Sequence, residues 1–378
     1  MKKIIIIGGG FAGIQAAKQI SKLKNVECIL FDNKEYTVMK PSLPDVIGGT
    51  IEDDFLVEKI VKLIPKKILF KKEKVGKIDL INKSIVTDTG NYKYDYLIIA
   101  SGSRSNFYKF DQNLNKLYKL DFLEDALRIK NDFLDYISNT SKPTVVISGA
   151  SFTGIELACA LFSLSVSKKK HVKIILIERA NLLGPLPLNI RDYMRNYIFS
   201  LGFILIEECE VISFDGKNIK LNNNQSFDNV FFCWCAGVKI SISDIAGNHS
   251  GLPDGRIIVN EFLQIPERKE VFAVGDSAAI KNKDMYLRRA VNFSIYSGKI
   301  AGRNIFNIIS NKKLKKFYPL DLGWIIPIYN SSIGKVLGIT IKGRIGLRLH
   351  YFMCALRNYN LKNKFFYLKL MFNKTSAK

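Results

Sequence analysis

The sequence predicts an α/β fold with two Rossmann-like dinucleotide-binding domains, followed by a basic region of amphipathic helices. Three observations lead to this prediction. A glycine-rich turn at residues 8–13 lies between an apolar run and a helical pattern, and the same arrangement returns at residues 149–154. After Asp321 the chain contains no acidic residue but many basic ones. Strands that alternate with helices are typical of parallel sheets covered by helices.

Length and composition limit the classes of protein that fit. A chain of 378 residues is long enough for two or three domains. A hydrophobic fraction of 47% and a charged fraction of 24% exclude a disordered chain. The formal net charge of +23 favours a polyanionic partner, either nucleic acid or an anionic lipid surface.

Cysteine usage and hydropathy indicate the compartment. Six cysteines show neither a CxxC pair nor the spacing of zinc ligands, so we expect buried structural thiols, a reducing compartment and no metal site. The N-terminal apolar run has only four isoleucines before the glycines, which is too short for a signal peptide. No stretch approaches the roughly 18 to 20 apolar residues that a membrane-spanning helix needs. We therefore expect a protein that is cytoplasmic or attached to the cell membrane from its cytoplasmic side.

The first glycine turn has the features of a dinucleotide-binding motif. It reads GxGxxG and consists of Gly8, Gly9, Gly10, Phe11, Ala12 and Gly13. Gly8 permits the tight turn, Gly10 lets the backbone approach a pyrophosphate, and Gly13 lets the helix pack on the strand. The helix N-terminus offers unpaired N–H groups and a positive dipole end to the phosphates. Asp32 ends the next apolar run, and its carboxylate can accept hydrogen bonds from the adenosine ribose.

The second turn repeats this pattern with one change. It consists of Gly149, Ala150, Ser151, Phe152, Thr153 and Gly154. Ser151 replaces the second glycine and reduces the clearance for a pyrophosphate, so we expect a working but imperfect site. Glu178, at the end of the next strand, accepts bonds from a free 2′-hydroxyl and repels a 2′-phosphate, which favours NADH over NADPH despite the adjacent Arg179. A structural unit without a ligand is the alternative.

With further segments, these motifs resemble flavoproteins that contain two dinucleotide-binding domains, and more narrowly type II NADH dehydrogenases and their sulfide:quinone oxidoreductase relatives. Similar motifs run from residue 2 to about residue 305. Residues 94–102 are similar to the family's YDYLVIATG segment, and residues 230–239 resemble its VIWTAGVK segment. Residues 271–276 are similar to the second FAD motif, whose aspartate, here Asp276, binds the ribityl chain.

The resemblance implies an FAD-dependent enzyme that transfers hydride from NADH to FAD and on to a membrane quinone without pumping protons. It divides the chain into an FAD domain (residues 1–107 and 239–320), an inserted NADH domain (108–238) and a C-terminal membrane-association region (321–378). Besides the two turns, Asp32, Glu178 and Asp276, the implied cofactor-binding residues are Lys40, Pro41, Ala100, Ser101, Gly102, Ala236, Gly237 and Gly275.

Two residues are candidates for a role in catalysis. Lys40, next to Pro41, matches a family segment that lies near the flavin ring. Glu156 matches a family glutamate close to the point where nicotinamide meets flavin, and a carboxylate that interacts with the helix dipole explains Glu156 equally well. Hydride transfer needs no protein nucleophile, because the flavin supplies the chemistry and the protein supplies position and electrostatics.

Cysteines and side-chain amides in the sequence bear on the electron donor and the electron acceptor. Sulfide-oxidising relatives use cysteines beside the flavin, and neither residues 39–44 nor the second glycine turn contains one, so NADH fits better than sulfide. The family's glutamine-rich AQxAxQ helix, where quinone docks, corresponds to residues 290–298, and Asn292 replaces one amide at most. NADH oxidation is therefore better supported than quinone as the acceptor. The enzyme alternative is a flavin oxidoreductase that takes electrons from sulfide or passes them to another acceptor. The alternative of another class is a redox-sensitive flavoprotein that binds nucleic acid.

The C-terminal region combines positive charge with apolar side chains. An apolar stripe at helical spacing is formed by Ile345, Leu349, Phe352, Met353 and Leu356, and residues 365–372 form an apolar block with one charge. The basic residues are Lys335, Lys342, Arg344, Arg348, Arg357, Lys362, Lys364, Lys369, Lys374 and Lys378. Basic amphipathic helices of this kind lie in a membrane interface and bind anionic lipids. A domain-capping helix or a homodimer contact is the alternative, and a nucleic-acid arm fits less well because phosphate binding does not need these aromatic residues.

Overall fold

The computed structural model describes residues 1–373, so Lys374 and Lys378 of the predicted basic set lie outside the described residues. The chain forms two compact units. Unit 1 comprises Met1–Val38, Val57–Arg104 and Lys239–Leu322. Unit 2 comprises Met39–Leu56, Ser105–Val238 and the C-terminal part from Gly323. This division differs from the predicted domain boundaries because residues 39–56 and the C-terminal region both belong to the unit that contains the second glycine turn.

Unit 1 is built on a six-stranded sheet whose central strands are parallel. Its strand order is β21 (Gln264–Ile265), β22 (Arg268–Ala273), β9 (Tyr96–Ile99), β1 (Lys2–Ile7), β2 (Val26–Asp32) and β5 (Leu69–Lys72). In β1 the isoleucines from Ile4 to Ile7 are all buried, as the uninterrupted β-branched run predicts for a strand covered on both faces.

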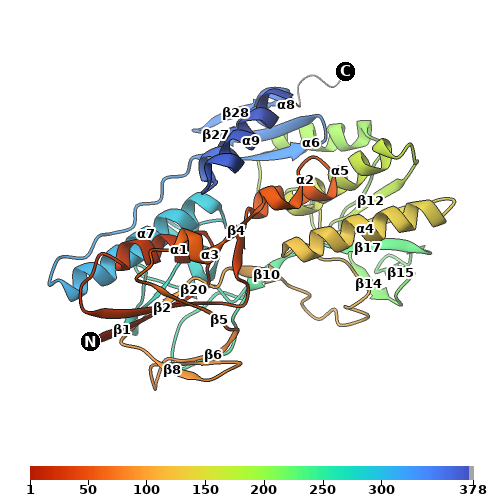
Figure 1. Cartoon of the computed structure of the whole chain (residues 1–378). Helices are drawn as coiled ribbons and strands as arrows, with labels where there is room; N and C mark the ends of the chain where they lie inside the picture. The colour runs from red at the N-terminus through yellow and green to blue at the C-terminus, as the bar shows by residue number, and fades with distance from the viewer. Residues whose placement is uncertain (374–378) are drawn as a thin grey trace. The chain divides into compact units, whose positions relative to one another are not determined.

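Two long helices of unit 1 pack closely against each other (Figure 1). They are α1 (Phe11–Ile20), which follows the first glycine turn, and α7 (Val291–Ile309). A Cβ atom at Gly298 of α7 would lie 2.1 Å from the carbonyl oxygen of Ala12, and one at Gly302 would lie 2.6 Å from that of Ala16. These glycines therefore allow the two backbones to approach, which fixes the start of α7 relative to the first glycine turn.

Small sheets and short helices complete unit 1. The pair β3 (Tyr36–Val38) and β4 (Val57–Lys59) precedes α3 (Ile60–Leu63), and a four-stranded sheet has the order β19 (Ile245–Ala246), β6 (Val75–Asp79), β7 (Ser84–Thr87), β8 (Asn91–Lys93). Further elements are β20 (Ile257–Ile258), η3 (Gly275–Ser277), β23 (Ala278–Ala279), β24 (Lys281–Asn282) and β25 (Met285–Tyr286). Strands β10 (Ser103–Ser105) and β18 (Val238–Ile240) pair where the chain leaves and re-enters unit 1.

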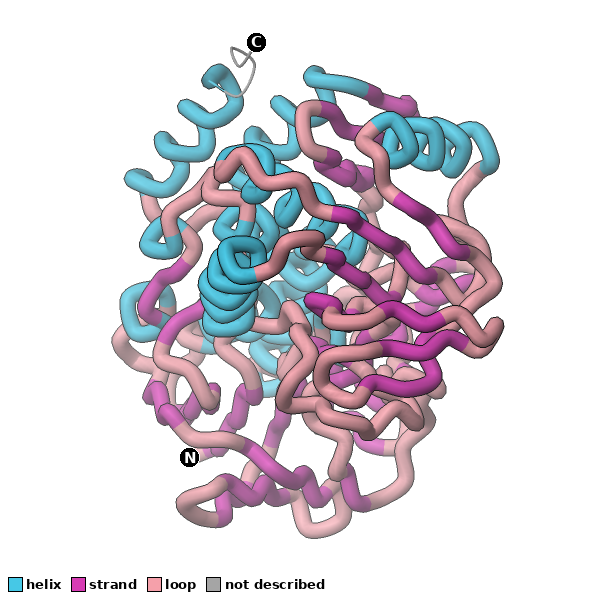
Figure 2. Tube along the Cα trace, turned by 90° about the vertical axis from the view of Figure 1, so that its right-hand side faces the viewer, coloured by secondary structure: helices cyan, strands magenta, loops and turns pink. Residues whose placement is uncertain are grey.

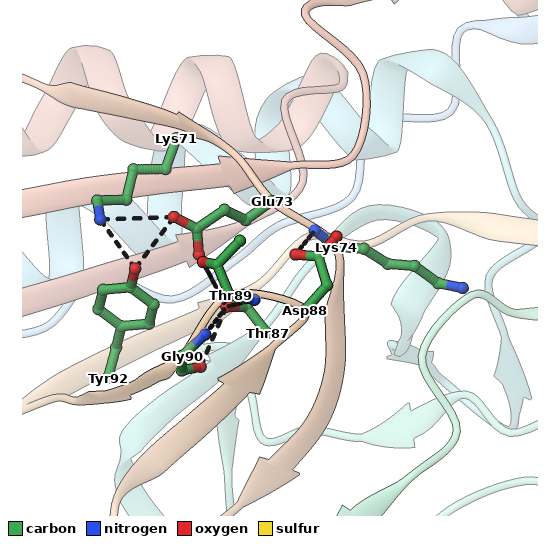
Figure 3. A network of polar contacts seen from close by, with 8 residues as sticks. All are labelled: Lys71, Glu73, Lys74, Thr87, Asp88, Thr89, Gly90 and Tyr92. Carbon is green, nitrogen blue, oxygen red and sulfur yellow. Dashed lines mark hydrogen bonds and ion pairs between the residues drawn. The ribbon is translucent and has the colours of Figure 1, made fainter.

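A polar network connects β5 to the small sheet (Figure 3). The Glu73 carboxylate accepts hydrogen bonds from Thr87 Oγ1 at 2.7 Å and from the Tyr92 hydroxyl at 3.0 Å, and it forms an ion pair with Lys71 at 3.4 Å. Burial alone would raise the pKa of Glu73, but hydrogen bonds from Thr89, Thr87 and Tyr92 and the charge of Lys71 hold that pKa below its ordinary value. Glu73 therefore stays ionised and fastens the small sheet to the parallel sheet.

Unit 2 contains a second parallel sheet. Its order is β13 (Ile204–Ile206), β12 (Lys173–Ile177), β11 (Thr144–Ser148), β17 (Val230–Trp234), and its long helices are α4 (Leu123–Asn139), α5 (Phe152–Ser167) and α6 (Leu188–Ser200). An antiparallel sheet of β14 (Val211–Phe214), β15 (Ile219–Leu221) and β16 (Ser226–Phe227) adds to its core. Residues 39–56 contribute η1 (Lys40–Ser42), α2 (Leu43–Ile47) and η2 (Asp53–Phe55). The α/β fold with two Rossmann-like sheets is confirmed.

The C-terminal part of unit 2 begins with an antiparallel sheet that the sequence analysis did not predict. The sheet consists of β26 (Gly323–Ile328), β27 (Ser331–Val336) and β28 (Ile339–Lys342). Two helices follow, α8 (Gly343–Arg357) and α9 (Leu361–Asn373), and α9 is the last helix before the grey trace in Figure 2. Across residues 1–373, the structure contains no helix with both the length and the apolar character needed to cross a membrane.

The predicted apolar stripe of α8 lies on its exposed side. Ile345, Phe352 and Leu356 are 66%, 39% and 65% exposed. The opposite side of α8 is buried and carries Leu347, His350, Tyr351, Cys354 and Ala355. The amphipathic pattern therefore contains two apolar faces, and only one of them packs on the protein.

Candidate functional site

The first glycine turn shows which glycines the fold requires. Gly8 has φ +105°, and a Cβ atom there would lie 2.2 Å from the carbonyl oxygen of Ala100. A Cβ atom at Gly13 would lie 1.8 Å from the carbonyl oxygen of Gly8. Gly10 is different, because its backbone is extended and a Cβ atom would meet nothing within 4 Å. Gly8 and Gly13 are thus needed for packing, whereas Gly10 leaves open space at the N-terminus of α1.

Asp32 lies where the sequence predicts it, at the end of β2, and it also holds the glycine turn in place. Its Oδ2 accepts a hydrogen bond from the Gly9 N–H at 2.6 Å, and its Oδ1 accepts one from the Lys34 N–H at 2.9 Å. The motif predicts only the ribose contact for this carboxylate. The fold-building contact was missed because it depends on the path of the turn and not on residue spacing.

The second glycine turn, in unit 2, repeats this geometry. Gly149 has φ +99°, and a Cβ atom there would lie 2.5 Å from the carbonyl oxygen of Cys235. A Cβ atom at Gly154 would lie 1.9 Å from the carbonyl oxygen of Gly149. Glu178 accepts a hydrogen bond from the Ala150 N–H at 2.8 Å, just as Asp32 does in the first turn. The repeat includes the carboxylate as well as the glycines.

Ser151 is the one difference between the two turns. Its backbone dihedrals, φ −87° and ψ −173°, are close to those of Gly10, φ −81° and ψ −166°. The Ser151 side chain is exposed and makes no capping hydrogen bond to α5. A side chain at this position is therefore compatible with the backbone of the turn. In the second turn, the Ser151 side chain occupies the space that is equivalent to the open space at Gly10 in the first turn.

The remaining predicted residues of unit 1 surround the turn between β22 and η3. Asp276 accepts a hydrogen bond from the Ser103 hydroxyl at 2.8 Å. The Gly102 N–H donates to Ser277 Oγ at 3.0 Å, and Ser101 Oγ lies 3.1 Å from the same atom. Gly275 has φ +61°, and a Cβ atom there would lie 3.3 Å from Ala12 Cβ. The structure thus brings Ala100, Ser101, Gly102, Gly275 and Asp276 to the first glycine turn. Ser103 and Ser277 are hydrogen-bond partners that no sequence motif predicts.

Predicted residues of unit 2 are distributed along its sheet edge. Ala236 and Gly237 follow β17. Gly237 has φ +155°, and a Cβ atom there would lie 2.3 Å from the hydroxyl oxygen of Tyr108. Phe152 is partly buried against Trp324, with ring centroids 5.2 Å apart. Thr153 is exposed on the first turn of α5.

Lys40, Pro41 and Glu156 all belong to unit 2. The Lys40 ammonium lies 5.4 Å from the centre of the Phe122 ring. Pro41 and Glu156 line one small cavity of about 70 Å³. The other lining residues are Pro44, Asp45, Gly48, Thr50, Cys159, Ala160, Ser163, Pro327, Tyr329, Asn330 and Leu347.

The electrostatics of this cavity favour a neutral Glu156. Burial of its carboxyl raises the pKa of Glu156 well above the ordinary value, and the charge of Asp45 raises it further. Asp45 accepts a hydrogen bond from the buried Tyr351 hydroxyl at 2.8 Å. Glu156 therefore keeps its proton to higher pH than an ordinary glutamate, and in that form it can donate a hydrogen bond, which an ionised carboxylate cannot do.

The cysteines lack the properties of reactive thiols. All six are free, and five of them are buried. Burial raises the pKa of Cys159 and that of Cys354 to about 12, so neither is a thiolate at neutral pH. Because the thiolate is the reactive form, these environments do not favour sulfide chemistry.

The residues in place fit the two predicted dinucleotides. Unit 1 has open space at the N-terminus of α1, where a Cβ atom at Gly10 would meet nothing within 4 Å. A pyrophosphate needs such close access to backbone N–H groups. Asp32 and Asp276 both belong to unit 1, and their carboxylates are of the kind that would accept hydrogen bonds from sugar hydroxyls. Unit 2 has an equivalent turn and carboxylate, Glu178, but the side chain of Ser151 leaves less room at the start of α5.

Comparisons with known proteins agree with this geometry. Among curated relatives, the type II NADH:quinone oxidoreductases of Staphylococcus saprophyticus and Staphylococcus aureus are 24% and 23% identical to this chain, each over 91% of it and 92% of the relative. The structure of NDH2 from Plasmodium falciparum in complex with NADH is similar with a TM-score of 0.85 and 18% identity, and covers 99% of this chain and 98% of that chain.

A second solved structure shares the fold. The sulfide:quinone oxidoreductase of Aquifex aeolicus gives a TM-score of 0.78 at 20% identity, and covers 96% of this chain and 92% of that chain. The family profile of pyridine nucleotide-disulphide oxidoreductases matches residues 2–294, which include both glycine turns and the Gly275–Ser277 turn. The chain belongs to the pyridine nucleotide-disulphide oxidoreductase family.

Proposed function

We propose that this chain is an FAD-dependent NADH dehydrogenase that passes electrons from NADH to a membrane quinone without pumping protons. The observation that supports it most is the duplicated turn geometry, in which Gly8 and Gly149, and Gly13 and Gly154, meet equivalent backbone atoms. Unit 1 would hold FAD and unit 2 would hold NADH. When bound, FAD supplies the chemistry of accepting hydride and passing on electrons.

In unit 1, the chain's own residues bind and orient the flavin dinucleotide. The N–H groups at the start of α1 would bind the pyrophosphate, and Asp32 would accept a hydrogen bond from the adenosine ribose. Asp276, held by Ser103, would bind the ribityl chain. These contacts fix the cofactor without any covalent bond to the protein.

In unit 2, Glu178 would select NADH over NADPH. One of its carboxylate oxygens accepts the Ala150 N–H, so the side chain is held at the edge of the turn. A 2′-phosphate at that place would meet a fixed negative charge. Ser151 would lie beside the pyrophosphate and reduce its room. Glu156 and Lys40 would act as the groups that orient the reacting parts, with Glu156 as a hydrogen-bond donor.

Quinone is proposed as the acceptor because the curated relatives are type II NADH:quinone oxidoreductases. Of the amide side chains in the family's quinone-docking helix, this chain has only Asn292 in the corresponding residues 290–298. Asn292 is buried, and its Nδ2 donates to the Leu320 carbonyl at 3.0 Å. This amide therefore supports the protein's own backbone, and quinone recognition would depend on other residues.

The exposed apolar side chains of α8 and α9 support a peripheral position on an anionic membrane at its cytoplasmic side. On α9, Leu361, Phe365 and Phe372 are 69%, 68% and 64% exposed and recur at helical spacing. Arg348 and Lys362 are exposed on the same helices. The apolar side chains would enter the boundary of the acyl chains, and the basic side chains would contact anionic headgroups. Each basic side chain would contribute on the order of 1 kcal/mol to the free energy of membrane binding.

A liposome experiment separates this membrane proposal from a homodimer contact. The full chain should sediment with anionic liposomes, and salt should weaken this binding without abolishing it, because only the electrostatic part is screened. The triple variant Ile345→Ser, Phe352→Ser, Leu356→Ser should bind more weakly, because only the apolar side chains of α9 and the basic residues remain. The control Ile81→Ser, at a residue 64% exposed in unit 1, should bind as wild type does. If the wild-type chain ignores liposomes and the triple variant instead converts a dimer into a monomer, the helices form a subunit contact.

Steady-state turnover tests the proposed activity. The purified chain, loaded with FAD, should oxidise NADH with a soluble quinone as acceptor. If NADH reduces the bound flavin and electrons pass to a water-soluble dye but not to quinone, quinone is refuted as the acceptor, whereas NADH stands as the donor.

A further inference from the structure

Arg179 carries a positive charge that the proposed selection of NADH does not use. It follows Glu178 directly after β12, and its side chain is exposed. A guanidinium near this carboxylate position is the group that accommodates a 2′-phosphate in dinucleotide-binding folds. Arginine also binds phosphate through two parallel hydrogen bonds, so an Arg179 that reached the ribose would offset the repulsion by Glu178. The position of the Arg179 guanidinium therefore decides how selective unit 2 can be.

The Arg179 guanidinium lies over the ring of Tyr108. Its Cζ atom is 5.9 Å from the centre of that ring. A guanidinium placed over an aromatic ring is attracted by the negative face of the ring. Glu178 is held separately, since its Oε2 accepts the Ala150 N–H at 2.8 Å and its Oε1 accepts the Ala180 N–H at 3.2 Å. The two neighbouring charges are thus engaged by different parts of unit 2.

Tyr108 is fixed in place by the segment that precedes it. The Asn106 N–H donates to the Gly237 carbonyl at 2.9 Å, and the Asn106 carbonyl accepts from Trp234 Nε1 at 2.9 Å. Asn106 Oδ1 accepts the Tyr108 N–H at 3.0 Å. Tyr108 has φ +51°, a left-handed conformation that bulky residues rarely adopt. Backbone strain of this kind persists where the surrounding structure enforces it, and it is concentrated at functional sites.

The Tyr108 ring lies at the edge of the sheet that carries the second glycine turn. A Cβ atom at Gly237, just after β17, would lie 2.3 Å from the hydroxyl oxygen of Tyr108. Strands β12 and β17 are the two neighbours of β11, and β11 leads into the glycine turn that begins at Gly149. Arg179 therefore comes from one side of β11 and Tyr108 from the other, at the carboxyl end of the strands. Parallel sheets of this type bind dinucleotides at that end.

We propose that Tyr108 sets the cofactor preference of unit 2 by holding the Arg179 guanidinium away from the 2′ position of the adenosine ribose. This inference rests on the proposed function, since it requires a nicotinamide dinucleotide in unit 2. With Arg179 over the ring, the negative charge of Glu178 repels a 2′-phosphate without compensation. Without the ring, the guanidinium can turn to the 2′-phosphate and pair with it. Tyr108 is thus a positioning residue that acts on cofactor specificity through Arg179.

Binding of two dinucleotide fragments to the FAD-loaded protein tests this proposal. ADP-ribose and 2′-phospho-ADP-ribose differ only in the 2′-phosphate, and calorimetric titration gives the ratio of their dissociation constants. Tyr108→Leu should improve the relative affinity for 2′-phospho-ADP-ribose about two- to fivefold, the factor that corresponds to one cation–π contact at an exposed ring. This gain should be absent when Arg179→Gln is present as well. Tyr108→Phe keeps the ring and should behave as wild type.

Arg128→Gln is the matched control. Arg128 also lies over a tyrosine ring of unit 2, with its Cζ atom 4.7 Å from the centre of the Tyr118 ring, and it is exposed on α4. This variant should leave the ratio of the dissociation constants unchanged. Rates of flavin reduction should follow the fragment affinities, so Tyr108→Leu should narrow the gap between NADH and NADPH by the same factor.

The outcomes separate this inference from the proposed function. If neither fragment binds and neither NADH nor NADPH reduces the flavin of the folded protein, both are refuted. If NADH reduces the flavin but Tyr108→Leu leaves the fragment ratio unchanged, or changes it equally with and without Arg179, only the inference is refuted. Should Tyr108→Leu fail to fold, Arg179→Gln decides alone. It should weaken relative binding of 2′-phospho-ADP-ribose by less than about twofold, and a larger loss would show that the guanidinium already reaches the phosphate.

Discussion

Gly10 offers a test that separates ligand binding from folding. Its φ of −81° and ψ of −166° suit any residue, and a Cβ atom there would meet nothing within 4 Å. Gly10→Ala should therefore leave the apoprotein as stable as wild type, or more stable by about 0.4–1 kcal/mol, because alanine restricts the unfolded chain. Its methyl group would occupy the space proposed for the pyrophosphate. We expect FAD affinity to fall by roughly tenfold or more, which corresponds to about 1.4 kcal/mol.

Gly13→Ala is the matched contrast. Its Cβ atom would lie 1.8 Å from the carbonyl oxygen of Gly8, where ordinary contacts begin at 3.4 Å. The turn must therefore shift by more than 1 Å, and overpacking of this kind costs about 1–3 kcal/mol or more. In this variant the apoprotein itself should be destabilised.

Thermal unfolding of the apoproteins and titration with FAD distinguish the two variants. We expect Gly10→Ala to unfold no earlier than wild type while binding FAD weakly, and Gly13→Ala to unfold earlier. Gly10→Ala that retains FAD with wild-type affinity would refute the assignment of this space to the pyrophosphate. An apoprotein destabilised by Gly10→Ala would show that the glycine serves the fold instead.

Four further predictions concern unit 2. Ser151→Gly should lower the NADH concentration for half-maximal flavin reduction without changing the limiting rate, and a higher concentration would show that the serine hydroxyl helps binding. Glu178→Ala should reduce the ratio of the flavin reduction rates with NADH and NADPH, and an unchanged ratio would speak against its role. Burial and Asp45 raise the pKa of Glu156 in the folded protein. Above about pH 4, Glu156 ionises in the unfolded chain but stays protonated in the folded protein, which lowers the free energy of unfolding. Glu156→Gln should therefore stabilise the protein against urea more at pH 8 than at pH 4, and the opposite trend would contradict the raised pKa. Cys159→Ala should leave the rate of flavin reduction by NADH unchanged. If this variant is folded and flavin-loaded but NADH no longer reduces its flavin, sulfide chemistry would be favoured.

Local patterns in the sequence predicted the parts of the fold that depend on local rules. The glycine turns, the carboxylates at the ends of β2 and β12 and the apolar stripe of α8 follow from the spacing of neighbouring residues. A tight turn was predicted at Gly8, and its φ of +105° agrees with that. Close packing of the helix was predicted at Gly13, where a Cβ atom would lie 1.8 Å from the carbonyl oxygen of Gly8.

Features formed by distant segments were not predicted. The sheet of β26, β27 and β28 follows short runs with no clear alternation, and residues 39–56 belong to unit 2 although they lie between segments of unit 1. Asp254 accepts hydrogen bonds from both Arg256 and Arg289, and no spacing rule connects two arginines that lie so far apart in the sequence. Contacts of this kind arise from the path of the chain and are visible only in three dimensions.

Anaerobic mixing of the FAD-loaded chain with reduced nicotinamide dinucleotides tests the central claim most directly. The flavin absorbance should bleach on addition of NADH, and more slowly with NADPH, because Glu178 is held at the edge of the second turn by the Ala150 N–H. A flavin that neither NADH nor NADPH reduces, in a folded protein that retains FAD, would contradict the claim that unit 2 delivers NADH to the cofactor of unit 1.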